Sequence, residues 1–367
     1  MRVFHIGADH FVELDDLPAQ LPASGFLWVG SARREFEVSV ARIQAQLQSW
    51  TGGQLVDLHV SDLLNNQLPS HFDDTSWYDL MVFRRLAVGS GSESLFVDDQ
   101  HGTLASARKA LQAIDTSPVG FAVFDRVLLT VHPADCAVRD HFAARLRQQA
   151  GSGEPRGQAR LPASPADLML RMANHMVDSY LELRRLLTRH LGTLQNELLD
   201  SKSRFDDWKV MLEARNTLHV LEDTCEDQRS AIQEWIDAMD ELPSESDKAA
   251  KRERELLRLR SRDVLEHIER VLTHVRRLEH SVEAAVQMHF SALGHRTNDI
   301  MRTLTVLTAI FLPLNLITGF FGMNFDTLPL IHSATGIWTA VGAMAIIGIG
   351  LVAYFRRKRY LGSQLRK

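Results

Sequence analysis

The chain has 367 residues, enough for two or three domains, and its 41 basic and 46 acidic side chains give a net charge of -5. This balance argues against a nucleic-acid-binding protein, and the two cysteines, Cys136 and Cys225, form neither a CxxC pair nor a disulfide framework. Residues 1–14 lack the apolar segment of a signal peptide, so most of the chain is expected to lie in the cytosol.

Residues 1–150 are predicted to form a cytosolic α/β domain. Short apolar runs bounded by turn residues are typical of strands, and such runs occupy 1–7, 25–30, 80–86, 94–99 and 119–132. Helical spacing of apolar residues occurs in two further segments, 33–50 and 103–115. The next segment, 151–165, is rich in Gly, Pro and Ser and is expected to be a linker.

A helical stalk domain is predicted for residues 166–300. Its first helix should begin with Ser164 as the N-cap and Pro165 at the first helical position. An apolar stripe follows at steps of three and four residues, which indicates a helix that packs on its neighbours. The members of the stripe are Leu168, Met172, Met176, Tyr180, Leu183, Leu187, Leu191, Leu194 and Leu198.

Two longer helices are predicted to complete the stalk. One covers about 203–240 and ends in the segment ELPSES, and the other begins near Asp247 and meets no proline before Pro313. At ~1.5 Å per residue, some seventy helical residues reach about 100 Å. A helix of that length needs partners along it, so we expect an oligomer.

A membrane domain is predicted for residues 301–355, with spans at about 303–322 and 335–355. No charged residue occurs within 303–325 or within 333–355. Each run is long enough to cross a hydrocarbon core of ~30 Å. The alternative is an apolar hairpin that is buried inside a soluble protein.

The charges that flank the two spans predict their orientation. The tail, 356–367, is basic, whereas the connecting loop, 323–334, contains one acidic residue and no Lys or Arg. By the positive-inside rule, both termini are expected in the cytoplasm and the loop outside.

The first span has a polar stripe along one face. Residues at alternating steps of three and four share one side of a helix, and this side holds Asn298, Met301, Thr305, Thr308, Leu312, Asn315 and Gly319. Polar groups in a membrane usually face a bundle interior or a water-filled path, so copies of this helix are predicted to surround a pore. Rings of Met301, Leu304 and Leu312 could close it by dewetting. The alternative is that the Thr hydroxyls bond to their own helix and one Asn contacts a neighbouring helix.

The segment that ends the first span carries a motif. Gly322-Met323-Asn324 lies within the pattern Phe-Gly-Met-Asn-Phe-Asp-x-x-Pro, while residues 262–267 are RDVLEH and residues 297–301 are TNDIM. Together with two C-terminal spans and Pro313, these stretches resemble the CorA family of divalent-cation transporters. The likeness covers the whole chain and is strongest from residue 160 onward.

The resemblance implies a funnel-shaped homopentamer in a bacterial-type inner membrane, with the five first spans lining the pore. Gly322, through its carbonyl, and Asn324, through its amide oxygen, would form an outer selectivity ring on either side of Met323. Asp263 would belong to a regulatory site, where it shares a metal ion with an acid of the neighbouring subunit's N-terminal domain.

The implied cargo is Mg²⁺, with Co²⁺ and Ni²⁺ as further ions, entering the cytosol down the electrochemical gradient. Mg²⁺ dehydrates reluctantly, so a ring of neutral oxygens could bind its waters without removing them. Mg²⁺ bound between subunits would also hold the pore closed when cytosolic Mg²⁺ is plentiful. The expected partners are further copies of the chain, the lipid bilayer and divalent cations, with no organic cofactor and no nucleic acid.

The external loop departs from the pattern of many relatives. Leu330 follows Pro329 where those relatives have a glutamate, so Asp326 is the only acid of the loop and should attract cations more weakly. Zn²⁺, with or without proton coupling, is the alternative cargo. The family's zinc branch has a different sequence after Met-Asn, and a lone His332 is not the tetrahedral N/S set that Zn²⁺ prefers. The stalk histidines, His267, His274, His280, His289 and His295, are typical of a solvated helix surface.

Two other classes of protein compete with a transporter. A membrane-anchored sensor that does not conduct would have no use for the polar stripe. An anchored enzyme finds little support, because the motifs G-x-x-x-x-G-K-[ST], H-E-x-x-H and G-x-S-x-G do not occur in the sequence.

Overall fold

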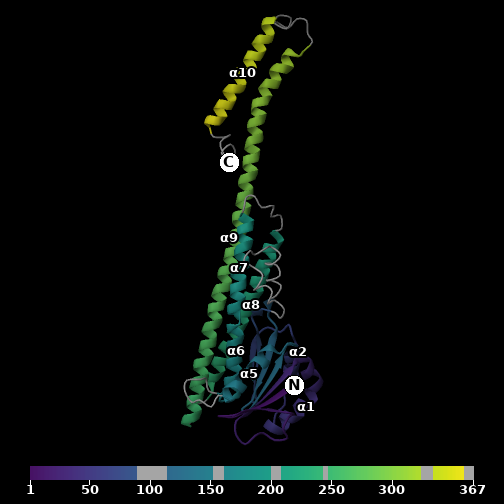
Figure 1. Ribbon diagram of the computed structural model, residues 1–367, viewed down its shortest axis with the longest axis vertical. Helices are drawn as coiled ribbons and strands as arrows, with labels where there is room; N and C mark the ends of the chain where they lie inside the picture. The colour runs from purple at the N-terminus through teal and green to yellow at the C-terminus, as the bar shows by residue number, and fades with distance from the viewer. Residues whose placement is uncertain (89–113, 152–160, 200–207, 243–246, 324–333, 359–367) are drawn as a thin grey trace. The chain divides into compact units, whose positions relative to one another are not determined.

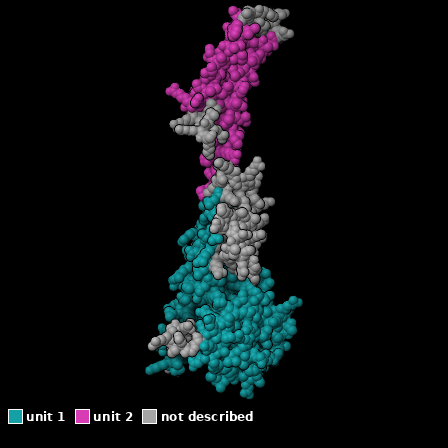
Figure 2. All heavy atoms as spheres, viewed as in Figure 1, with its two compact units in different colours: residues 1–285 teal, residues 286–367 magenta. Residues whose placement is uncertain are grey.

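The computed structural model divides the chain into two compact units, residues 1–285 (unit 1) and residues 286–367 (unit 2; Figure 2). The residues that the structure describes are 1–88, 114–151, 161–199, 208–242, 247–323 and 334–358.

The N-terminal part of unit 1 contains a seven-stranded sheet. Its strands are β1 (Arg2–Ile6), β2 (Phe11–Leu14), β3 (Phe26–Ala32), β4 (His71–Asp74), β5 (Asp79–Arg84), β8 (Pro118–Val123) and β9 (Val127–His132). They are ordered β2-β1-β3-β9-β8-β5-β4. Only β3 and β9 are parallel neighbours in this sheet. A separate antiparallel pair joins β6 (Ala87–Val88) to β7 (Ile114–Asp115).

Helices cover both faces of the seven-stranded sheet (Figure 1). On one face lie α1 (Arg33–Thr51) and α2 (Asp57–Leu64), and on the other lie α5 (Ala137–Gly151) and α6 (Pro165–Asp178). Every residue of β8 and β9 is buried, as expected for strands that are covered on both sides. The predicted α/β domain is therefore confirmed.

Two sequence predictions in this domain need correction. The run 119–132 is a hairpin and not one strand, because the chain turns at Asp125 and the Phe124 N–H donates to the Val127 carbonyl at 2.9 Å. Ile114 and Asp115 belong to a strand, whereas a helix was predicted for 103–115. The rest of that helix and the strand predicted at 94–99 lie outside the described residues.

The predicted helical region is present. It comprises α6, α7 (Tyr180–Leu199), α8 (Trp208–Glu241) and α9 (Lys248–Phe321), which continues through Pro313 without ending. The Ser164 hydroxyl accepts from the Asp167 N–H at 3.4 Å, so the predicted N-cap is confirmed. The described side chains of the apolar stripe, from Leu168 to Leu191, are at most 2% exposed. Leu194 and Leu198 are not among the described side chains.

The contact between α8 and the unit 1 part of α9 is called here the α8–α9 seam. The Trp235 indole N–H donates to the Ser261 hydroxyl at 3.0 Å in the buried part of the seam. At its edges, Arg258 pairs with Asp240, and Arg215 pairs with Glu283 at 3.4 Å. Because later residues of α8 pair with earlier residues of α9, the two helices are antiparallel.

Candidate functional site

The described part of unit 2 consists of the end of α9 and α10 (Ala334–Arg357). Both helices are long and apolar enough to cross a membrane, and only 6% and 11% of their most apolar windows are buried within the protein. Leu312 is 68% exposed and Trp338 is 77% exposed. Apolar surface left in water costs about 25 cal/mol per Å², so these helices require lipid or other protein copies around them.

The predicted pore stripe forms one open face of α9. Its seven residues are exposed, and so is the adjacent Leu304: Asn298, Met301, Leu304, Thr305, Thr308, Leu312, Asn315 and Gly319. The opposite side of the helix is less exposed, with Val306 buried and Pro313 and Ile317 half-buried. The chain's own packing thus uses one side of α9 and leaves the polar side free for other contacts.

The threonine hydroxyls of this stripe bond to their own helix. Thr305 Oγ1 donates to the Met301 carbonyl at 2.8 Å, and Thr308 Oγ1 donates to the Leu304 carbonyl at 2.9 Å. This is the contact on which the non-pore alternative rested. It does not remove the oxygen from use, because a hydroxyl that donates its proton keeps lone pairs that can accept from water.

The end of α9 holds the first two residues of the Gly-Met-Asn motif. The Gly322 N–H donates to the Thr318 carbonyl at 2.9 Å, and a Cβ at Gly322 would lie 3.0 Å from that carbonyl oxygen. Glycine therefore fits here more easily than a larger residue. Met323 is 49% exposed, while Asn324 and Asp326 lie outside the described residues.

The predicted regulatory residue, Asp263, lies on an open surface of α9. Its carboxylate is 59% exposed and lies 3.8 Å from His267 Nε2. His267 Nδ1 lies 3.2 Å from Asp178 on α6, a neighbour that the sequence did not suggest. An exposed carboxylate is free to share a cation with a second molecule, although one chain does not enclose a site around it.

Three stalk histidines are less solvated than the sequence predicted. His267, His274 and His289 are half-buried, whereas His280 and His295 are exposed. Burial lowers the pKa of His274, with nearby Arg184 as a further cause. The prediction of a solvated histidine surface is therefore wrong for these three residues, of which His267 and His274 face α6 and α7.

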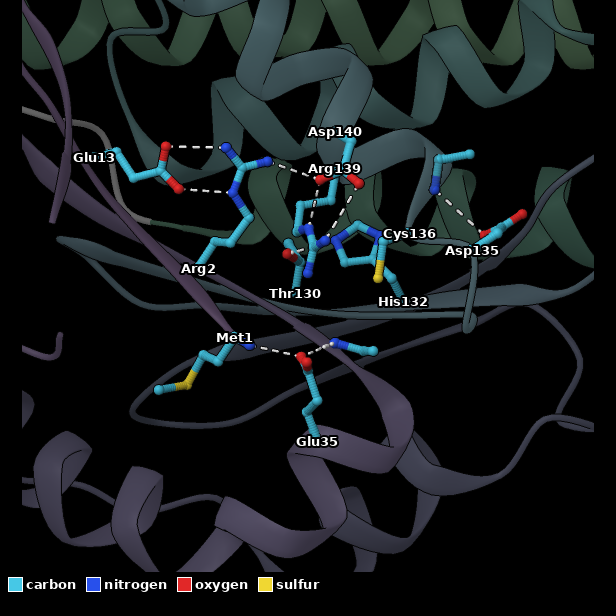
Figure 3. Close-up of polar contacts among 12 residues, drawn as sticks. Met1, Arg2, Glu13, Glu35, Thr130, His132, Asp135, Cys136, Arg139 and Asp140 are labelled. Carbon is cyan, nitrogen blue, oxygen red and sulfur yellow. Dashed lines mark hydrogen bonds and ion pairs between the residues drawn. The ribbon is translucent and has the colours of Figure 1, made fainter. Parts of the chain in front are cut away.

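The start of α5 gathers polar side chains from several elements of the α/β domain (Figure 3). Arg2 donates to Glu13 at 2.7 Å and to Asp140 at 2.8 Å, and the Met1 ammonium donates to Glu35 at 2.6 Å. These pairs tie β1 to β2, α5 and α1. The charged side chains of this cluster are thus engaged in ion pairs that hold these elements together.

The same cluster contains His132 and Cys136, a residue combination that some hydrolases use. Complete burial lowers the pKa of His132 to about 3, so this imidazole stays neutral, and its Nε2 bonds Thr130 at 2.8 Å. Burial also raises the pKa of the Cys136 thiol. A nucleophilic cysteine needs the thiolate, and both shifts oppose its formation.

A family model described as "CorA-like Mg2+ transporter protein" matches residues 101–357. The magnesium transport protein CorA of Haemophilus influenzae is 26% identical over 67% of this chain and 73% of its own length. The cobalt/magnesium transport protein CorA of Thermotoga maritima is 31% identical, but over only 27% of this chain and 28% of its own length.

Solved structures share the fold at low sequence identity. The complete structure of the CorA magnesium transporter from Methanocaldococcus jannaschii aligns with a TM-score of 0.69 at 17% identity, over 97% of both chains. The full-length CmaX protein aligns with a TM-score of 0.54 at 17% identity, over 98% of this chain and 97% of its own.

Proposed function

Because the chain belongs to the CorA-like Mg²⁺ transporter family, we propose that it carries Mg²⁺, and also Co²⁺ and Ni²⁺, into the cytosol as a homopentamer. Five copies of the end of α9 would line the pore, with α10 on the outside. The observation that carries this proposal is the open polar stripe on α9, from Asn298 to Gly319, in a helix segment without charge after Arg302.

The absence of charge in this segment suits a strongly hydrated ion. Mg²⁺ keeps several of its waters when it binds, so the proposed ligands contact water and not the metal. The Gly322 carbonyl and the Asn324 amide would form the outer ring, and the Thr305 and Thr308 oxygens would accept from waters further along. Neutral oxygens bind weakly enough to release the ion, whereas rings of carboxylates would hold it.

Apolar residues of the same stripe would form the closed gate. Met301, Leu304 and Leu312 are each more than half exposed in the single chain, so they are available to meet their copies around a pore axis. A narrow ring of such side chains excludes water, and a hydrated cation cannot pass without it. We propose that Mg²⁺ shared between Asp263 and an acid of the next subunit favours this closed state.

The driving force would be the ion gradient and the membrane potential. The potential supplies about 2.3 kcal/mol per charge per 100 mV, and twice that for a divalent ion. Arg356, Arg357 and Lys358 directly follow the apolar part of α10 and are exposed. Their position supports cytoplasmic termini. We propose a bacterial-type inner membrane as the location.

The proposal is tested by Mg²⁺ uptake into proteoliposomes that contain a Mg²⁺-sensitive dye. The native chain should admit Mg²⁺, and Asn324→Ala should lose most of this flux. Thr339→Ala is the matched control, because the Thr339 hydroxyl donates to the Gly336 carbonyl of α10 at 2.8 Å and lies outside the proposed pore. Equal flux through native chain and Asn324→Ala would refute the filter, and Zn²⁺ flux that follows a pH gradient would replace Mg²⁺ as the cargo.

A further inference from the structure

Three metal-ligating side chains meet on the α8–α9 seam of unit 1, and none of them belongs to the proposed pore. His219 and Glu222 come from α8, and Glu279 comes from α9. One ligand atom of each residue lies within 4.8 Å of the corresponding atoms of the other two. A single ion could therefore contact all three without a change in the helix backbones.

The helix geometry explains why these residues converge. His219 and Glu222 are three residues apart on α8, so their side chains lie on the same face. The antiparallel seam places Glu279 opposite them, between the Arg215–Glu283 pair and the contacts of Arg276 with Glu222 and Glu226. The ligand set is thus held by ion pairs on both sides.

Two carboxylates of this group lie close together. A carboxylate oxygen of Glu222 lies within 4.8 Å of a carboxylate oxygen of Glu279. Two ionised carboxylates repel at this separation unless a cation or a proton lies between them. Arg276 is a cation close to one of these acids: its Nε lies 2.6 Å from Oε1 of Glu222, and its guanidinium also pairs with Glu226.

We propose that His219, Glu222 and Glu279 bind a first-row divalent transition ion of the Zn²⁺ class. One imidazole nitrogen and two carboxylate oxygens are three of the ligands that such an ion accepts, and water can supply a fourth. Mg²⁺ favours an all-oxygen octahedron with several waters, so the imidazole selects against it. The site is built within one chain in unit 1, and it stands whether or not unit 2 conducts Mg²⁺.

Arg276 is the built-in competitor of this site. Its guanidinium donates to Glu222 at 2.6 Å and also contacts Glu226. When a metal ion takes Glu222, the guanidinium can stay on Glu226, because one carboxylate accepts both of its N–H groups. Loss of Arg276 should therefore strengthen metal binding, whereas a purely structural salt-bridge network predicts no such gain.

The test is Zn²⁺ binding to the full-length chain in detergent micelles by isothermal titration calorimetry. The native chain should bind one Zn²⁺ ion tightly, and this binding should be lost in His219→Ala and in Glu279→Gln. His280→Ala is the matched control, because His280 is exposed on α9 and adjoins Glu279 in sequence but lies outside the ligand set. Mg²⁺ at the same concentration should not displace Zn²⁺. All variants keep the pore residues, so a difference between them reports this site alone.

A second arm keeps the test decisive if a ligand variant fails to fold. Arg276→Ala should bind Zn²⁺ on the order of tenfold more tightly than the native chain, because a positive charge that repels the ion and competes for Glu222 is removed. Equal Zn²⁺ stoichiometry and affinity in native chain and His219→Ala would overturn the proposal. Unchanged or weaker binding in a folded Arg276→Ala would overturn it as well.

Discussion

The two parts of α9 meet different surroundings although they form one continuous helix. In unit 1, Val264, Ile268 and Val275 are at most 1% exposed, and charged residues pair across the α8–α9 seam. In unit 2, Leu304 and Leu312 are 56% and 68% exposed, and the polar residues beside them are Asn and Thr. In the first part, apolar and charged side chains are packed or paired within the chain. In the second part, the apolar and polar side chains are exposed and can contact lipid or other copies of the chain.

This difference in exposure predicts which residues contribute to stability and which contribute to transport. A side chain that is buried within its own unit contributes mainly to folding, whereas an exposed one in an apolar helix contributes to what surrounds it. Substitutions in unit 1 should therefore change unfolding, and those on the open face of unit 2 should change flux. The following experiments test whether substitutions in the two units differ in this way.

The largest effect is expected for a charge inside the buried part of α9. Val275→Asp should destabilise unit 1 by about 3–5 kcal/mol, because an unpaired carboxylate would lie where no water reaches. Thermal unfolding of the purified chain measures the loss. Thr273→Asp is the control, since Thr273 is exposed on the same helix turn. Two equally stable variants would mean that this part of α9 is not a buried core.

A polar substitution on the open face should act on flux and not on folding. Leu312→Ser should raise Mg²⁺ entry into Mg²⁺-loaded vesicles on the order of tenfold, because a serine ring keeps water in the proposed constriction. Leu314→Ser is the control, since Leu314 is half-buried and lies on the other side of the helix. A lower unfolding temperature with unchanged flux would assign Leu312 to packing.

A partly buried acid of unit 1, Asp79, makes the stability of this unit depend on pH. Burial, with Asp74 and Asp125 nearby, raises the pKa of Asp79 to about 6 from 3.8. The folded state then binds more protons than the unfolded state between these values, so the destabilisation grows as pH rises through this window and is complete above it.

Asp79→Asn should therefore stabilise the chain by about 1–2 kcal/mol at pH 7.5, allowing for water that screens a partly exposed group. The gain should shrink towards zero near pH 4. Melting temperatures at the two pH values measure it, with Asp9→Asn at an exposed position as the control. A gain that is the same at both pH values would contradict the assigned titration.

The smallest effect is expected for one hydrogen bond of the seam. Trp235→Phe should lower the unfolding free energy by about 1 kcal/mol, because the Ser261 hydroxyl loses its indole donor in a buried place. Thermal unfolding measures the change. Trp338→Phe on α10 should have no such effect, since Trp338 is 77% exposed. A larger loss at Trp338 would reverse the contrast between the two units.

Much of the fold could be predicted from local signals. Ser164 and Pro165 mark a helix start with their own chemistry, and the stripe from Leu168 to Leu191 repeats the helical period. The hairpin within 119–132 was missed because Asp125 and Arg126 form a short turn without Gly or Pro between two apolar runs. Ile114 was assigned to a helix because spacing alone does not show the pairing of β6 with β7.

The candidate sites also differ in how far the sequence could predict them. The open stripe on α9 depends on one helix, so its period could be seen in the sequence, and the structure leaves those residues exposed. Their role in a pore, and the filter at Asn324, remain predictions that the flux experiments address. The contact of His219 and Glu222 with Glu279 depends on the register between two helices, for which the sequence carries no local signal.

The α8–α9 seam also limits how the two helices can move. Contacts at Arg215, Trp235, Arg258 and Arg276 each join one position of α8 to its opposite on α9. A slide by one helical turn, about 5.4 Å, would break all of them at once and would place unlike partners together. Tilting as a rigid pair breaks none. The seam therefore opposes sliding of α8 along α9, and we expect the two helices to move together as a pair.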